Sequence, residues 1–209
     1  KLTWQFYDKG EEIVSDYGAA RFLNVEAKYG GRYLPENNSY AKQSIAHNTV
    51  VVDETSHFDG AVELGNQNPA SLTFFETNEF GTVSKGEIDT AYDGVKLART
   101  LALINLPELD NSIALDVFDV LSEHSHQLDL PLHYQGQLIE TNLTMQSNTQ
   151  QLSVLGDKNG YQHLWLKGAA DSNSSGLNKV SWLNKNGRFY TQTSPVDINE
   201  GFLFTQIGA

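Results

Sequence analysis

Short runs of β-branched and alternating residues recur from one end of this chain to the other, with turn dipeptides between them. No window shows a convincing helical apolar period, and only residues 16–24 could form a short helical turn. Separators such as Asp59-Gly60, Asp93-Gly94 and Asn186-Gly187 favour tight turns between strands. The pattern predicts an all-β fold, a large antiparallel β-sandwich of about twelve strands, in place of alternating strands and helices. The predicted strands span residues 48–53, 71–76, 82–88, 96–106, 112–121, 127–134, 137–141, 151–155, 163–167, 179–183, 188–193 and 201–207.

The run 113–120 carries apolar side chains on both of its faces, because successive residues of a strand point to opposite sides. We therefore expect a central strand that is covered on both sides. Asp116 and Asp119 would then need partners, since an unpaired buried carboxylate costs several kcal/mol. Arg99 or backbone amides are the expected partners.

Composition limits the classes of function. A length of 209 residues suits a single all-β domain, so we expect one domain over residues 1–209. The net charge of -12 argues against a nucleic-acid partner, which would need clustered Lys and Arg. No apolar run is long enough to span a membrane. The chain has no cysteine, which excludes disulfides and thiol chemistry and removes the commonest structural zinc ligand.

The segment 36–53 is the most informative part of the sequence for function. A polar, loop-like run leads to His47 and Asn48, which stand at the start of a β-branched strand ending at Asp53. An imidazole and a carboxamide held at the mouth of a rigid strand can bind or polarise an anionic group. The alternative is that the pair only satisfies backbone groups where the strand begins.

Several segments together resemble the heparinase II/III-like domain, and are most similar to exolytic oligoalginate lyases of polysaccharide lyase family seventeen. The resemblance implies the C-terminal β-sandwich of an enzyme whose N-terminal half is an α/α toroid, with the active site in the cleft between them. It covers nearly the whole chain and falls on the sandwich alone. We therefore expect a fragment of a larger precursor that lacks its toroid. The matching segments are residues 16–22, 33–53, 92–95, 99–101 and 115–118.

The resemblance implies cleavage of a uronate glycosidic bond by β-elimination. By position, His47 matches the active-site histidine on the sandwich side, where it would contact the substrate carboxylate or assist proton abstraction. Tyr92 matches the family tyrosine that precedes the Arg-Thr-Leu strand. A free tyrosine has a pKa of about 10, so a basic role needs cationic or hydrogen-bonding neighbours. The alternative for Tyr92 is a turn-edge aromatic that covers the core.

Asn48 and Arg99 are the candidate substrate-binding residues. Each has a structural alternative: Asn48 as a cap of the incoming strand, and Arg99 as the partner of Asp116 or of a backbone carbonyl.

A zinc ion is also implied by the resemblance, with His57 and His126 as candidate ligands. The spacing of His124 and His126 would place both on one face of a strand and permit joint ligation. Thr49 stands where some family members have a second histidine. That departure argues against an inherited metal site.

The expected partners are an acidic oligosaccharide and the toroid of the same protein, and the expected location is a bacterial exported one, periplasmic or associated with the outer membrane. A lone sandwich half should show little lyase activity. A carbohydrate-binding β-sandwich with Trp4, Trp165 and Trp182 as sugar platforms is one alternative, and a structural scaffold is another. Tryptophans buried between sheets would remove the binding alternative.

Overall fold

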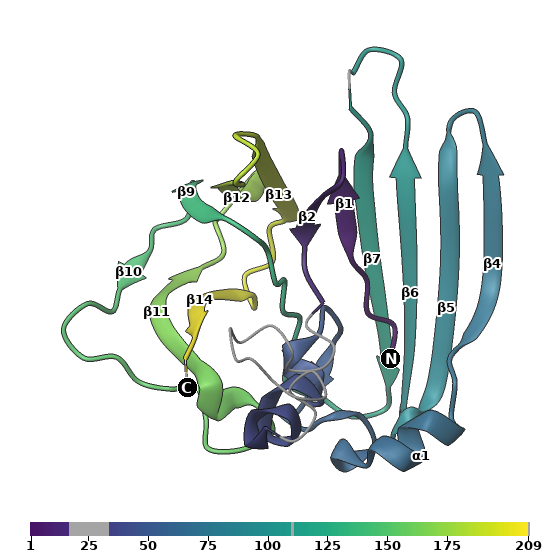
Figure 1. The fold of residues 1–209 in the computed structure, drawn as a ribbon, viewed down its shortest axis with the longest axis vertical. Coiled ribbons are helices and arrows are strands. Elements are labelled where there is room, and N and C mark those ends of the chain that lie inside the picture. Colours follow the sequence, from purple (N-terminus) through teal and green to yellow (C-terminus); the bar gives the residue numbers. More distant parts are fainter. Residues whose placement is uncertain (17–33, 110, 209) are drawn as a thin grey trace. The chain divides into compact units, whose positions relative to one another are not determined.

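The computed structural model describes residues 1–16, 34–109 and 111–208, and strands are their main regular structure (Figure 1). Every strand pair in this part of the chain is antiparallel. The predicted all-β class with antiparallel pairing is therefore confirmed. No helix in the described ranges is long and apolar enough to cross a membrane.

The chain divides into two compact units, where the sequence suggested one domain. Unit 1 comprises Lys1–Trp4 and Lys42–Pro131, and unit 2 comprises Gln5–Ala41 and Leu132–Ala209. Each unit therefore combines an early and a later stretch of the chain. All of the predicted site residues lie in unit 1.

Unit 1 is built on a four-stranded meander in the order β4-β5-β6-β7. The Asp93-Gly94 turn joins β5 to β6, with Gly94 at a φ of 69° that favours glycine. A second, two-stranded sheet pairs β3 with β8. The elements of this unit are η2 (Ser44–Ala46), β3 (Val51–Val52), η3 (His57–Gly60), α1 (Val62–Gln67), β4 (Ser71–Asn78), β5 (Gly81–Tyr92), β6 (Val95–Ile104), β7 (Ile113–Ser122) and β8 (Leu128–Asp129).

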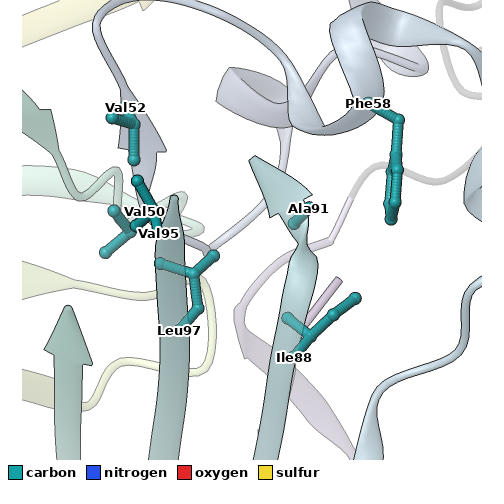
Figure 2. Packing of buried hydrophobic residues seen from close by; sticks show 7 residues of the cluster. All are labelled: Val50, Val52, Phe58, Ile88, Ala91, Val95 and Leu97. Carbon is teal, nitrogen blue, oxygen red and sulfur yellow. The ribbon is translucent and has the colours of Figure 1, made fainter. Parts of the chain in front are cut away.

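The register of the meander gives it two distinct faces. Leu97 on β6 lies opposite Ile88 on β5 and Val120 on β7, so these three side chains share one face. We call it the inner face, because Leu97 and Ile88 belong to the main hydrophobic core. Figure 2 shows how residues from the loop around β3 and from η3 complete that core. Its buried members are Val50, Val52, Phe58, Ile88, Ala91, Val95 and Leu97.

Unit 2 holds two three-stranded sheets, β13-β12-β9 and β10-β11-β14, and a β1-β2 hairpin. Leu143, Ala170 and Val180 form its buried apolar cluster, against which side chains of β9 and β14 pack. Both larger sheets therefore contribute to one core, as in a small β-sandwich. The elements are β1 (Phe6–Asp8), β2 (Glu11–Val14), η1 (Asn37–Ala41), β9 (Gln137–Thr141), β10 (Gln146–Ser147), η4 (Tyr161–His163), β11 (Leu164–Asp171), β12 (Leu177–Leu183), β13 (Phe189–Pro195) and β14 (Gly201–Ile207).

Several element predictions need correction. The expected strands at 48–53 and 127–134 shrink to two residues each, and 151–155 forms only an isolated bridge between Val154 and Trp165. The predictions missed β1, β2, β10 and the short helix α1. The central position expected for 113–120 is wrong, because β7 is an edge strand with largely exposed side chains. The helical turn expected at 16–24 lies outside the described residues, apart from Asp16.

Candidate functional site

The chain around His47 is held in place by main-chain and side-chain hydrogen bonds on both sides. The His47 amide donates to the Ser44 carbonyl (3.1 Å), and the Thr49 amide donates to the His47 carbonyl (2.8 Å). The Ser44 hydroxyl accepts a hydrogen bond from the His57 amide (2.8 Å). His47 is half-buried, whereas residues 44–46 and 48–52 are buried. The segment therefore carries one half-buried histidine on a fixed backbone.

Asn48 points into the interior, in contrast to its neighbour. Its side chain is 0% exposed, and its amide Nδ2 donates to the carbonyl of Trp4 (3.0 Å). The Thr49 side chain is also 0% exposed and donates to the Lys1 carbonyl (2.7 Å). These contacts tie the segment to the N-terminal residues of unit 1. Burial of Asn48 argues for a structural role in place of the predicted substrate contact.

Arg99 on β6 is buried and saturated with partners. Its Nε and Nη2 donate to the two carboxylate oxygens of Asp116 on β7, at 2.8 and 2.6 Å. Its Nη1 donates to the main-chain carbonyls of Leu2 (2.6 Å) and Asn48. The guanidinium also lies 5.1 Å from the Phe118 ring centre. The structural alternative for Arg99, as the partner of Asp116 and of backbone carbonyls, matches this geometry, and burial argues against a substrate contact.

Tyr92, at the end of β5, joins separate parts of unit 1. Its hydroxyl donates to the Thr55 carbonyl (2.7 Å) and accepts from the Val52 amide (3.2 Å). Its ring stands edge-on to that of His57, with centres 5.0 Å apart. Burial raises the pKa of Tyr92 well above its ordinary value, and nearby aspartates add to the rise. The Tyr92 side chain is thus a protonated phenol and a poor base. Its contacts fit the alternative of an aromatic at a turn edge that covers the core. The catalytic role of Tyr92 stays a prediction.

His57 is a buried, neutral histidine. Its Nε2 donates to the Val50 carbonyl (3.0 Å), and its Nδ1 accepts from the main-chain nitrogen of Lys1 (2.9 Å). Burial lowers the pKa of His57 to about 3, because the imidazolium form would lose its hydration. Both ring nitrogens therefore have protein partners.

His126, in the loop after β7, links Asp53, which follows β3, to Ser122, the last residue of β7. Its Nδ1 donates to Asp53 (2.7 Å), and its Nε2 is hydrogen bonded to the Ser122 hydroxyl (2.9 Å). The hydrogen bond from His126 lowers the pKa of Asp53, helped by the Gln127 amide. His124 and His126 lie outside any strand, so the reason given for their joint ligation does not hold.

The zinc prediction gains no support from these histidines. In the described parts of the chain, no three His, Cys, Asp or Glu side chains come together where they could hold a metal ion. The imidazole nitrogens of His57 and His126 have hydrogen-bond partners within the protein. The residues present therefore do not fit a zinc centre built on these two ligands.

Trp4 and Trp182 pack within their units, contrary to what sugar platforms require, and Trp165 on β11 is half-buried. Trp182 is buried, with ring centres 4.9 Å from Tyr134 and 6.1 Å from Tyr190. Trp4 is half-buried, and the Arg99 guanidinium lies 5.7 Å from its ring centre. These positions count against the carbohydrate-binding alternative.

Sequence reasoning missed two structural links of the site. The N-terminal residues Lys1, Leu2 and Trp4 supply carbonyls to the side chains of Thr49, Arg99 and Asn48. Asp53 fixes the loop after β7 through His126 and Gln127. Carbonyl acceptors leave no trace in a sequence, and the hydrogen-bond partners of the Asp53 carboxylate stand more than seventy positions away from it.

Comparison with known proteins identifies the family. Residues 1–201 match the family model described as heparinase II/III-like, C-terminal, and the chain belongs to this family. An exo-oligoalginate lyase from Saccharophagus degradans is 43% identical over 213 residues, which cover 100% of this chain and 28% of that protein. An alginate lyase from Stenotrophomonas maltophilia is 46% identical over 191 residues, which cover 91% of this chain and 26% of that protein. The chain thus spans little more than a quarter of the length of either relative, and the predicted family resemblance is confirmed.

Proposed function

We propose that this chain is the sandwich part of a polysaccharide lyase that cleaves oligoalginate, exolytically, by β-elimination. The substrate class is supported by two relatives that carry alginate lyase names and align along most or all of the chain. Exolytic action is supported by the name of one of them. The bacterial export expected from the sequence remains part of the proposal.

The structural observation that carries the proposal is the contrast at His47. The residues on either side of it, Ala46 and Asn48, are buried, whereas His47 is half-buried. A catalytic group is most effective when its backbone is fixed and only the reactive atoms face the substrate. Asn48 and Arg99 are buried, whereas His47 and Tyr92 are both half-buried. The Tyr92 hydroxyl is already bonded to the Thr55 carbonyl and the Val52 amide, so His47 fits this condition better.

The chemistry gives His47 one of two tasks. In β-elimination a base removes the C5 proton, a C4–C5 double bond forms, and the bond from C4 to the glycosidic oxygen breaks as that oxygen takes up a proton. The C5 proton becomes acidic only when the neighbouring carboxylate is neutralised. An imidazole can donate to that carboxylate or accept the proton. The remaining groups would come from the part of the longer enzyme that this chain does not include.

The test compares this chain alone with the longer enzyme on purified oligoalginate. The longer enzyme should generate absorbance from 4,5-unsaturated uronate and release monomers from the start. The chain alone should show no turnover above background, because half of the cleft is missing. Saturated products from the longer enzyme, or full activity from this chain alone, would contradict the proposal.

A further inference from the structure

The second face of the four-stranded sheet, which we call the outer face, is apolar and exposed. Strand pairing places Ala102 on β6 opposite Val83 and Leu115, and Ile104 opposite Ile113. Thr100, two residues along β6, lies opposite Val117. Phe74, opposite Lys85, and Leu121, opposite Lys96, lie on the same face. Five of its large apolar side chains are more than two-fifths exposed: Phe74 47%, Ile113 43%, Leu115 46%, Val117 42% and Leu121 64%.

The outer face carries charged side chains beside its apolar rows: Glu76 lies opposite Val83, Asp119 lies opposite Ala98, and Lys85, Glu87 and Lys96 form a cluster. Glu87 accepts ion-pair contacts from Lys85 (3.0 Å) and Lys96 (2.9 Å), so its charge is already satisfied within the sheet. The apolar rows begin beside this cluster and continue to the β4–β5 turn. Exposed contiguous apolar surface of this kind marks an interaction site in soluble proteins. A flat apolar sheet face is suited to pack against another sheet or helix layer.

The outer face is on the opposite side of the sheet from the Arg99 cluster. Arg99 is two residues from Leu97 on β6, so its side chain shares the inner face, where it reaches the carbonyl of Asn48. The segment carrying His47 is thus anchored on the inner side. Whatever covers the outer face is therefore separate from the contact that completes a cleft at His47.

We infer that the outer face is an intramolecular docking surface, covered in the longer enzyme by a layer of the same polypeptide that precedes this C-terminal part. The family model is described as C-terminal, and the relatives carry about three quarters of their length outside the aligned part. A second copy of the chain is a poorer occupant, because two bodies of net charge -12 repel one another. A tethered layer has a high effective concentration and can dock on a surface of modest affinity.

The inference rests on the proposed place of this chain within a longer lyase, but its test does not measure turnover. The chain contains no cysteine, so single cysteines can be introduced without interference from native thiols within it. Val117→Cys and Leu115→Cys report on the outer face, and Ile198→Cys is the matched control at an apolar site that is 87% exposed. Any cysteine elsewhere in the longer enzyme is first replaced by serine.

Maleimide labelling under native conditions is measured for each variant in the chain alone and in the longer enzyme. Val117→Cys and Leu115→Cys should react at least tenfold more slowly in the longer enzyme, whereas Ile198→Cys should change less than twofold. Equal labelling rates in both contexts would overturn the inference. Protection that is already present in the chain alone would also overturn it; dependence of that protection on protein concentration would then identify a second copy as the occupant. Because inactive enzyme can still protect the outer-face cysteines, loss of activity and loss of protection are separate results.

Discussion

The inner and outer faces of the four-stranded sheet are made by the same strands but are completed in different ways. On the inner face, Leu97 is 0% exposed and the charge of Arg99 is compensated by Asp116 and two carbonyls. On the outer face, Leu115 and Val117 of β7 are 46% and 42% exposed. The described residues therefore supply the contacts that fix the segment carrying His47 at one end of the inner face. They leave the outer face exposed, and also the far end of the inner face, where Leu72 is 69% and Phe75 60% exposed.

The largest expected effect comes from breaking the inner face. Arg99→Met removes a buried cation and leaves the Asp116 carboxylate, with a side chain 25% exposed, without its ion-pair partner. We expect a loss of about 3–5 kcal/mol in the free energy of unfolding, as for other broken buried pairs. Urea titration of the chain alone measures it. The outer-face control Val117→Thr should stay within about 0.5 kcal/mol of the parent in the same chain; equal losses for the two variants would abolish the contrast between the faces.

A pH effect of intermediate size is expected from His57. Its pKa in the folded chain, about 3, lies below its ordinary value of 6.5, so the unfolded chain takes up a proton first as the pH falls. Stability contributed by neutral His57 is complete above pH 6.5 and declines toward pH 3, by at most about 1.4 kcal/mol per pH unit.

His57→Gln keeps a polar side chain that does not titrate. Unfolding midpoints of this variant, measured at intervals from pH 7 to pH 4, should fall less steeply than those of the parent. Parallel curves for the two proteins would show that His57 does not carry the effect. Asp53, with its lowered pKa, contributes a decline of the same sign in both proteins.

The smallest effect on stability is expected for Tyr92→Phe. The variant loses the hydrogen bond to the Thr55 carbonyl and the one from the Val52 amide but keeps the ring contact with His57. The expected cost is about 1 kcal/mol in unfolding free energy. In the longer enzyme, kcat should fall no more than about threefold if Tyr92 only shapes the inner side of the site. A loss of several orders of magnitude in kcat would establish the catalytic role predicted from the sequence.

The sequence was informative where side-chain pattern alone decides structure. The alternating runs in β4 to β7 predicted four strands in nearly their observed positions, because hairpins between successive strands need only local turn chemistry. The pattern failed for β7 as a central strand, because apolar residues on both faces look the same whether a layer covers them or not. It also left Asn48 and Arg99 open between substrate-binding and structural roles, since a buried polar network and a binding site use the same residue types.

His47 connects the proposed function with the inner face of the sheet. Its backbone is fixed by hydrogen bonds on that side, and the residue is half-buried. The decisive measurement is kcat for oligoalginate in the longer enzyme carrying His47→Ala, with His124→Ala as a control at an exposed loop histidine. A loss of at least about a hundredfold, with an unchanged unfolding midpoint and near-parental activity in the control, is the predicted result. Near-parental kcat in His47→Ala would contradict a catalytic role and leave His47 as a structural residue of the segment that leads into β3.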